Sequence, residues 1–378
     1  MNIAVNAADL CSTRIDGTRI YIKNVLDHLG ELKQNSDSFF IYLKGKLNGN
    51  LQFTMHPNYT IRKSESPLFW TQLRLPRELK KDRPDVLWMP LQTIPFMLSS
   101  NIKTVVTIHD LAFKMFRDHF PVKDHLLLTI FTGHAIRTAA RIIAVSENTK
   151  KDIMRYYGVD SRKITVVHHG YDRTLFNQER AKNISEVSRV LAKHKVSKEY
   201  ILYAGAIQPR KNLSTLIKAF DILKRKDGFK NLALVIAGSN AWMHERVHEE
   251  AKRAQAKGDI IFTGAYKTED LPMLMGGAKA FVFPSLYEGF GIPLLEAMAC
   301  GTAVIAADNS SLPEVGGDAP CYFKAEDVGA LVECLERVIT DGALREEMVR
   351  KGLSRAQGFS WERCAVRTLE ILHDTHTL

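Results

Sequence analysis

The sequence predicts an α/β fold made of two doubly wound, Rossmann-like domains that face each other across a cleft. Three observations support this fold class. Short apolar runs alternate with amphipathic helical stretches through residues 1–170, the same alternation resumes after residue 198, and a polar, weakly patterned stretch separates the two parts. Such alternation indicates parallel sheets covered by helices on both faces. At 378 residues, the chain has the length of two ordinary domains.

Apolar runs and helical periodicity give the elements of each part. In the first part we expect strands at residues 3–5, 39–43, 59–62, 85–88, 103–108, 141–145 and 164–167, and helices at 19–32, 70–80, 124–139 and 149–157. In the second part we expect strands at residues 200–204, 232–237, 260–262, 280–283 and 302–306, and helices at 213–224, 244–257, 294–300, 328–339, 344–357 and 361–373. Ser146 is the expected cap of the helix at 149–157. Residues 171–198 are the expected linker.

The composition is that of a globular protein, with 45% hydrophobic residues. No apolar run is long enough to cross a membrane, and the first residues lack the pattern of a signal peptide. The five cysteines are scattered without metal-site spacing, which favours reduced, structural thiols. We therefore expect a cytoplasmic protein.

The net charge of +10 is concentrated in the first part, since residues 1–180 carry +9. This favours an anionic partner or an anionic membrane surface, with an ordinary basic, solvated surface as the alternative. No helix-turn-helix, zinc finger or other nucleic-acid signature is present, so we expect no nucleic acid partner.

One stretch combines a strand, a glycine loop and a helix. The apolar run at 280–283 is followed by the loop from Glu288 to Gly291, and Pro293 suits the first position of a helix. A helix N-terminus binds phosphate well, and Glu288 and Glu296 would accept hydrogen bonds from hydroxyl groups. The alternative is a solvated loop acid and an acid that suits the helix dipole.

A second loop, at residues 205–212, also lies between a strand and a helix. Gly205 allows close backbone approach, and Arg210 and Lys211 would bind a diphosphate. A solvated basic loop is the alternative. His109, at the end of another strand, would be either structural or functional.

These segments resemble a known family. The string from Pro284 to Gly301 resembles, without a gap, the Glu-x7-Glu signature of the retaining glycosyltransferases of family 4, which include sucrose synthases and bacterial polysaccharide mannosyltransferases. The resemblance extends to residues 144–147, 310–317 and 359–362. It implies the GT-B fold, with an acceptor-binding domain at 1–180, a sugar-nucleotide-binding domain at 181–360, and a last helix within 361–378 that packs back on the first domain.

The resemblance also implies roles for individual residues. His109, Glu288, Arg210 and Lys211 form the expected catalytic set, with His109 near the reacting carbon of the donor sugar. The expected donor-binding residues are Gly17, Gly205, Arg210, Lys211, Gly238, Ser239, Tyr266, Gly289, Phe290, Gly291, Ile292, Leu294 and Glu296. Many relatives have a second glycine near Gly17, where this chain has Arg19, so that contact is expected to differ.

The implied activity is transfer of a sugar from a nucleotide donor with retention at the anomeric carbon. The string at 208–212 resembles that of bacterial mannosyltransferases and favours GDP-mannose, with UDP-glucose or UDP-N-acetylglucosamine as alternatives. A sugar-nucleotide-binding protein without turnover, or an epimerase, would share the fold. We expect no cofactor and no metal, because no Asp-x-Asp motif of the metal-binding kind is present.

A basic segment suggests where the acceptor is presented. Seven cationic residues fall within residues 62–83 and are interleaved with apolar ones: Arg62, Lys63, Leu68, Phe69, Trp70, Leu73, Arg74, Leu75, Arg77, Lys80, Lys81 and Arg83. Such a segment suits the headgroup region of an anionic membrane, and the acceptor would then be a polyprenyl-diphosphate-linked saccharide. The alternative is an amphipathic helix that packs its apolar side into the core and a soluble saccharide acceptor.

Overall fold

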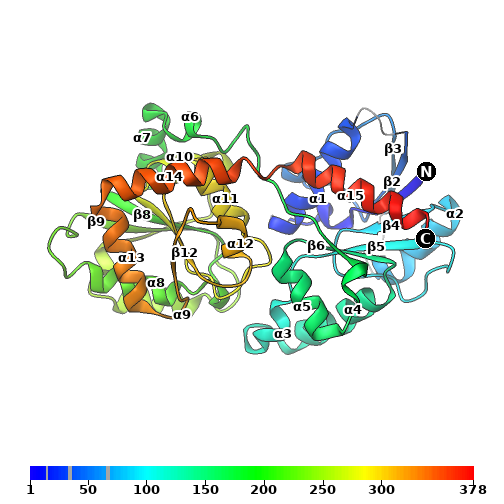
Figure 1. The fold of residues 1–378 in the computed structure, drawn as a ribbon, viewed down its shortest axis with the longest axis horizontal. Helices are drawn as coiled ribbons and strands as arrows, with labels where there is room; N and C mark the ends of the chain where they lie inside the picture. The colour runs from blue at the N-terminus through cyan, green and yellow to red at the C-terminus, as the bar shows by residue number, and fades with distance from the viewer. Residues whose placement is uncertain (14–15, 33–35, 65–68) are drawn as a thin grey trace. The chain divides into compact units, whose positions relative to one another are not determined.

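The computed structural model describes residues 1–13, 16–32, 36–64 and 69–378 (Figure 1). The chain divides into two compact units. Unit 1 comprises residues 1–170 and 360–378, and unit 2 comprises residues 171–359. The first division lies ten residues before the boundary expected at 180.

Unit 1 contains a sheet of seven parallel strands in the order β3-β2-β1-β4-β5-β6-β7. The strands are β1 (Asn2–Asn6), β2 (Ser38–Leu43), β3 (Tyr59–Lys63), β4 (Val86–Met89), β5 (Lys103–Ile108), β6 (Arg141–Ala144) and β7 (Ile164–Val166). Its helices are α1 (Gly17–Glu31), the π-helix η3 (Trp70–Arg74), α2 (Leu75–Asp82), α3 (Ala112–Met115), α4 (Val122–Thr138), α5 (Glu147–Tyr157) and α15 (Trp361–His376).

Unit 2 contains six parallel strands in the order β10-β9-β8-β11-β12-β13. They are β8 (Glu199–Ala204), β9 (Leu232–Ala237), β10 (Ile260–Gly264), β11 (Ala280–Phe283), β12 (Val304–Ala307) and β13 (Cys321–Phe323). The helices are α6 (Gln178–Ala181), α7 (Ile184–Lys193), α8 (Leu213–Leu223), α9 (Glu245–Arg253), α10 (Leu271–Gly276), α11 (Ile292–Ala299), α12 (Leu312–Gly316), α13 (Val328–Thr340) and α14 (Gly342–Ala356).

Both sheets have the doubly wound strand order, with the first strand of each unit next to the fourth. Helices cover both faces of each sheet, and the central strands β4, β9, β11 and β12 are buried along their whole length (Figure 1). The order reverses between β1 and β4 in unit 1, and between β8 and β11 in unit 2. Ligands of such sheets bind beyond the carboxyl ends of the strands at this switch point. A ligand site is therefore expected at the loops that follow these strands.

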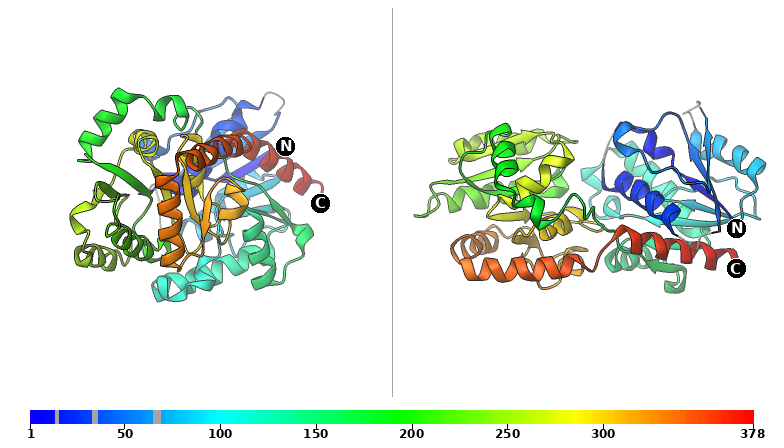
Figure 2. Two further views of the ribbon diagram at one scale, coloured as in Figure 1. Left: turned by 60° about the vertical axis from the view of Figure 1, so that its left-hand side comes forward. Right: turned by 90° about the horizontal axis from the view of Figure 1, so that it is seen from above.

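Local signals explain several helix ends. Asp16 caps α1 by accepting a hydrogen bond from the Arg19 backbone N–H, so the helix begins at Gly17. Ser146 caps α5 in the same way through Thr149, as the sequence predicts. The last helix, α15, packs on α1 within unit 1 (Figure 2).

Two expectations for unit 2 were wrong. The stretch at 171–198 is not an unstructured linker, because it forms α6 and α7, which both pack on α10. Burial of Phe176, Ala181 and Val190 attaches this stretch to unit 2. The three-residue edge strand β13 is also additional to the predicted strands, since it is too short to give a periodic signal.

Candidate functional site

The two candidate loops of unit 2 lie side by side at its switch point. The loop at 205–212 follows β8, and the loop at 284–291 follows the neighbouring β11. The Leu286 backbone N–H donates to the Arg210 carbonyl oxygen at 2.9 Å and joins the two loops. The doubly wound order thus brings together segments that are far apart in the sequence.

Gly205 and Gly238 allow the loops after β8 and β9 to approach each other. Both have positive φ angles, of 150° and 155°. A Cβ atom on Gly238 would lie 1.8 Å from the Gly205 carbonyl oxygen, so no other residue fits there. The Ser239 carbonyl oxygen accepts a hydrogen bond from the Ile207 N–H at 3.0 Å, which continues the pairing of the two strands into the loops.

Arg210, Lys211 and Glu288 form an ion cluster across the two loops. Lys211 Nζ is hydrogen-bonded to Glu288 Oε1, and Arg210 Nη1 lies 3.3 Å from Glu288 Oε2. Arg210 also donates to the Tyr287 carbonyl oxygen. The three side chains are only 14%, 12% and 10% exposed. The basic pair therefore occupies a poorly solvated position rather than a solvated loop.

The charge of Glu288 depends on this cluster. Burial by itself would raise the pKa of Glu288, but Lys211 and Arg210 lower that pKa below its ordinary value. Glu288 is thus a carboxylate at neutral pH. Two cations held at one point can accept an incoming anion, with which Glu288 would compete.

Asn212 is a supporting residue that the sequence did not single out. Its φ angle of 56° ends the short turn that carries Arg210 and Lys211. Its Nδ2 donates to the carbonyl oxygens of Pro284 at 3.1 Å and Ala325 at 2.6 Å. Asn212 therefore fixes the basic pair against the loop that carries Glu288.

The loop after β12 fixes the backbone around Glu288. The Glu288 N–H donates to Ser310 Oγ at 3.0 Å, and the Ser311 hydroxyl lies 2.9 Å from the Glu288 carbonyl oxygen and 2.8 Å from that of Phe290. Gly289 lies between these two anchored residues. Ser310 and Ser311 thus hold the glycine loop on both sides of Gly289 in the sequence.

The helix α11 begins immediately after this loop. Gly291 is its N-cap with a φ angle of 106°. Pro293 is the second residue of the helix, whereas the sequence predicts it at the first position. Ile292 and Leu294 are buried and fix the start of the helix, so they support the site through packing. The start of this helix lies next to the loop that carries Glu288. Pro293 contributes no N–H there, and the Leu294 N–H donates to the Gly291 carbonyl oxygen at 3.0 Å.

Glu296 lies in the middle of α11 among other titratable groups. Burial and the carboxylate of Asp172 raise the pKa of Glu296 to about 8. Burial and Glu296 in turn raise the pKa values of Tyr266 and Cys300. Asp172 was assigned to the linker because nothing in its local sequence indicates a site. Glu296 is thus electrostatically coupled to Asp172 and Tyr266, and its carboxyl group can exchange hydrogen bonds with hydroxyl groups.

Gly17 and His109 belong to unit 1. Gly17 is the first residue of α1. Arg19, which stands near it in place of a glycine, is hydrogen-bonded to Asp16 at 2.6 Å and to the Asp9 carboxylate at 3.3 Å. His109 follows β5, and its Nε2 lies 2.8 Å from the Pro90 carbonyl oxygen, to which it donates. Burial lowers the pKa of His109, so the ring is neutral and its Nδ1 carries no proton.

Across the described residues, no group of three or more His, Cys, Asp or Glu side chains could hold a metal ion. In the same part of the chain, none of the helices combines the length and hydropathy needed to cross a membrane.

Comparison with known proteins decides the family. Residues 17–175 match the family described as Glycosyltransferase Family 4, and residues 170–355 match Glycosyl transferases group 1. The chain is 31% identical over 269 residues to O-antigen chain mannosyltransferase B of Escherichia coli, covering 71% of this chain and 69% of that protein.

The chain belongs to glycosyltransferase family 4. A further relative of this glycosyltransferase, the serotype-specific mannosyltransferase WbdA of Escherichia coli, is 30% identical over 237 residues, which are 61% of this chain but only 28% of that longer protein.

Solved structures confirm the GT-B fold class of this glycosyltransferase. Sucrose-phosphate synthase from Thermosynechococcus elongatus superposes with a TM-score of 0.77 at 18% identity, covering 99% of this chain and 98% of that one. HepE of Anabaena, solved in complex with UDP-glucose, gives a TM-score of 0.75 at 16% identity, covering 99% and 100%.

Proposed function

We propose that this glycosyltransferase moves mannose from GDP-mannose to a saccharide or lipid-linked saccharide in the synthesis of a cell-surface polysaccharide, with retention and without a metal ion. The observation that carries the proposal is the cluster of Arg210, Lys211 and Glu288 beside the start of α11. It supplies two fixed cations where the leaving group of a nucleotide sugar would develop its negative charge.

The chemistry of the leaving group explains why such cations are needed. Breaking the bond between the anomeric carbon and the phosphate leaves both electrons on a nucleoside diphosphate. Arg210 and Lys211 would stabilise this charge, and the N–H groups at the start of α11 would add to them. Cationic side chains and a helix end would thus take the role that a metal ion has in other glycosyltransferases.

The acids and glycines would position the donor. In the bound state, Glu288 would release the cations to the diphosphate and accept hydrogen bonds from the sugar hydroxyls. Glu296 would accept from the ribose hydroxyls, for which it must be ionised. Gly205 and Gly291 would admit the diphosphate close to the backbone, and His109 would contact the donor sugar.

The donor is proposed from the relatives. O-antigen chain mannosyltransferase B and WbdA are both named as mannosyltransferases, which favours GDP-mannose. The complex of HepE with UDP-glucose makes UDP-sugars the second candidates. The relatives with O-antigen in their names support a saccharide acceptor, which a polyprenyl diphosphate would present at the cytoplasmic face of a membrane.

Incubation of the protein with candidate donors and a mannose-terminated acceptor tests the proposal. We expect release of GDP from GDP-mannose only when acceptor is present, and a product whose anomeric configuration, read by NMR, equals that of the donor. Conversion of the donor alone into another nucleotide sugar would indicate an epimerase, and donor binding without any product would indicate a binding protein.

A further inference from the structure

Large apolar side chains gather on the surface of unit 1. Eight of them are exposed within three segments, with Val122 the most exposed at 80% and Met97 at 73%. We call this set the unit 1 apolar face: Phe69, Leu73, Phe96, Met97, Val122, Leu126, Leu127 and Ile130. Large exposed apolar patches mark interaction sites more often than ordinary surface does.

Specific contacts join the three segments. The Gln72 side chain in η3 donates to the Ile94 carbonyl oxygen at 3.3 Å and accepts from the Phe96 N–H at 2.9 Å. The Phe96 ring packs against Phe131 and His134 of α4, with ring centroids 5.5 and 4.4 Å away. The segments that carry these apolar side chains are therefore joined through Gln72 and Phe96.

The first half of α4 has an exposed apolar side. Residues 122–131 of this helix include no buried residue, whereas the buried ones, Thr132, Gly133, Ala135 and Ile136, all lie further along it. Two turns of a regular helix thus present Val122, Leu126, Leu127 and Ile130 outward, although aliphatic side chains normally face the core.

Cationic side chains lie beside this face. Leu73 in η3 is followed at four-residue spacing by Arg77 and Lys81, and Arg77, Lys80 and Lys81 are all exposed on α2. Lys81 is paired with Glu78 at 2.9 Å, but its side chain stays 68% exposed. Arg62 is paired with Asp82 at 2.7 Å and is only 40% exposed, so it does not contribute in the same way. An apolar surface next to exposed cations complements a lipid bilayer that carries anionic headgroups.

The apolar residues of the basic segment at 62–83 are partly buried and partly exposed. Trp70 and Leu75 are buried, and Trp70 Nε1 donates to Asn6 at 3.0 Å, so these two residues belong to the core. Phe69 and Leu73 face outward. Leu68 lies outside the described residues. The alternative of an ordinary amphipathic helix therefore holds for one side of the segment only.

We propose that the unit 1 apolar face inserts into the surface of an anionic membrane, with Arg77, Lys80 and Lys81 bound to the headgroups. The apolar side chains supply contact with the acyl chains, and the cations supply selectivity for anionic lipid. This attachment is separate from the nucleotide site of unit 2, so it does not depend on which sugar is transferred.

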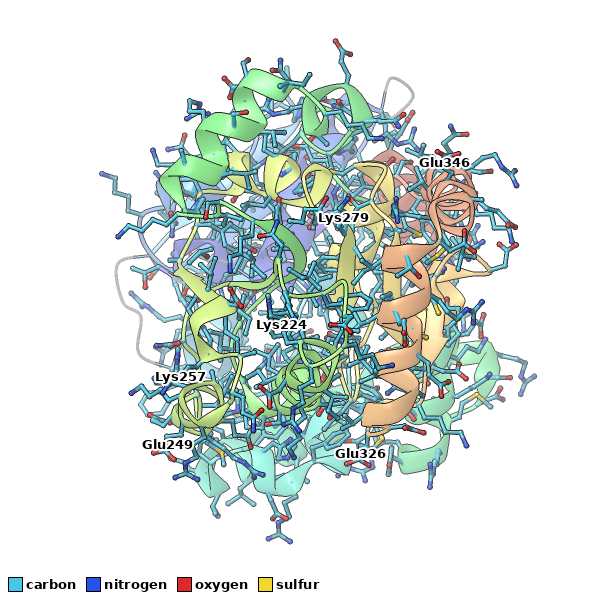
Figure 3. All side chains as sticks on the ribbon, turned by 90° about the vertical axis from the view of Figure 1, so that its left-hand side faces the viewer. Lys224, Glu249, Lys257, Lys279, Glu326 and Glu346 are labelled. Atoms are coloured by element: carbon cyan, nitrogen blue, oxygen red, sulfur yellow. The ribbon has the colours of Figure 1, made fainter. Side chains whose placement is uncertain are left out.

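Co-sedimentation with vesicles tests the proposal through three variants. The first is Leu126→Ser with Leu127→Ser, the second is Phe96→Ser with Met97→Ser, and the third is Arg77→Gln with Lys80→Gln and Lys81→Gln. Their matched controls lie in unit 2. Ile184→Ser with Met243→Ser changes exposed apolar residues, and Lys252→Gln with Arg253→Gln and Lys257→Gln removes cations on and beside α9, where Lys257 projects from the surface (Figure 3).

Binding of the wild type to phosphatidylglycerol vesicles should exceed that to phosphatidylcholine vesicles and should fall with salt. In both apolar variants, the partition coefficient onto the vesicles should fall at least tenfold. In the triple cation variant, the partition coefficient should fall about fivefold for each charge removed, and only with anionic lipid. The control variants should bind as the wild type does. GDP binding should be unchanged in all variants and would show that each protein is folded. Thermal unfolding should change little, except that Phe96→Ser loses the ring contacts with Phe131 and His134 and should lower the unfolding temperature slightly.

Equal, negligible binding of the wild type to both lipids would overturn the proposal. So would apolar variants that bind like the wild type. A wild-type dimer that the apolar variants convert to a monomer, without any vesicle binding, would assign the face to a second copy of this chain instead.

Discussion

Replacing Glu288 by Gln should destabilise unit 2 and at the same time strengthen GDP binding. The substitution keeps the shape of the side chain and removes its charge. Arg210 and Lys211 stay where they are only 14% and 12% exposed, without the carboxylate that now contacts both. Breaking a buried ion pair from one side costs about 3–5 kcal/mol, and we expect a loss of stability of this size.

GDP carries no sugar, so its affinity reports only how the diphosphate and Glu288 compete for Arg210 and Lys211. In the wild type, the diphosphate must displace Glu288 from Lys211 and Arg210. Without this competitor, GDP should bind more tightly by about 1.5–3 kcal/mol, the size of one charge-assisted hydrogen bond. Lys211→Ala should change GDP affinity by a similar amount in the opposite direction.

Urea unfolding followed by fluorescence measures the first effect, and titration calorimetry with GDP measures the second. Glu326→Gln is the matched control, because Glu326 is an exposed acid of the same unit and should change neither quantity. If Glu288→Gln changed the free energy of unfolding by less than about 0.5 kcal/mol, the cluster would not be buried as described. If it weakened GDP binding as Lys211→Ala does, Glu288 would not compete with the diphosphate for the two cations.

Three further predictions concern the same site. Arg210→Ala should lower kcat more than it raises KM, since its contact strengthens as charge develops on the leaving group, and steady-state kinetics with a change in KM alone would contradict this. Glu296 must lose a proton to accept hydrogen bonds from ribose hydroxyls, and its pKa is raised to about 8. GDP affinity should therefore rise about tenfold per pH unit up to pH 8 and then level off. Glu296→Gln should remove this pH dependence and weaken GDP binding, and an unchanged pH profile in this variant would exclude the role. Activity should be complete in excess chelator, and a loss that magnesium or manganese restores would show that a metal takes part.

The sequence predicted the fold well because most strands are continuous apolar runs. A buried parallel strand such as β9 or β11 is apolar along its whole length, and short helices or loops of clear composition separate the strands. The helix α7 was missed because its few apolar residues lie within a polar stretch. The strand β13 was missed because three residues are too few to show the alternation of apolar and polar side chains that marks a strand.

The site was predictable in its residues but not in its contacts. The string around Glu288 and the basic pair near Gly205 are local signals. The bond between Lys211 and Glu288 joins residues 77 positions apart, and it forms only because β8 and β11 are neighbours in the sheet. The effect of Asp172 on Glu296 and the support from Asn212 likewise depend on the folded arrangement.

The most direct test of the account is a thermal-shift panel of nucleotide sugars on the wild type and on Lys211→Ala. A ligand that binds only the folded state adds about 2.7 kcal/mol of stability at a hundred times its Kd. We expect GDP and GDP-mannose to raise the unfolding temperature of the wild type, and to lose most of this effect in Lys211→Ala. Shifts with UDP-sugars alone would reverse the choice of donor, and equal shifts in both proteins would contradict the assigned site.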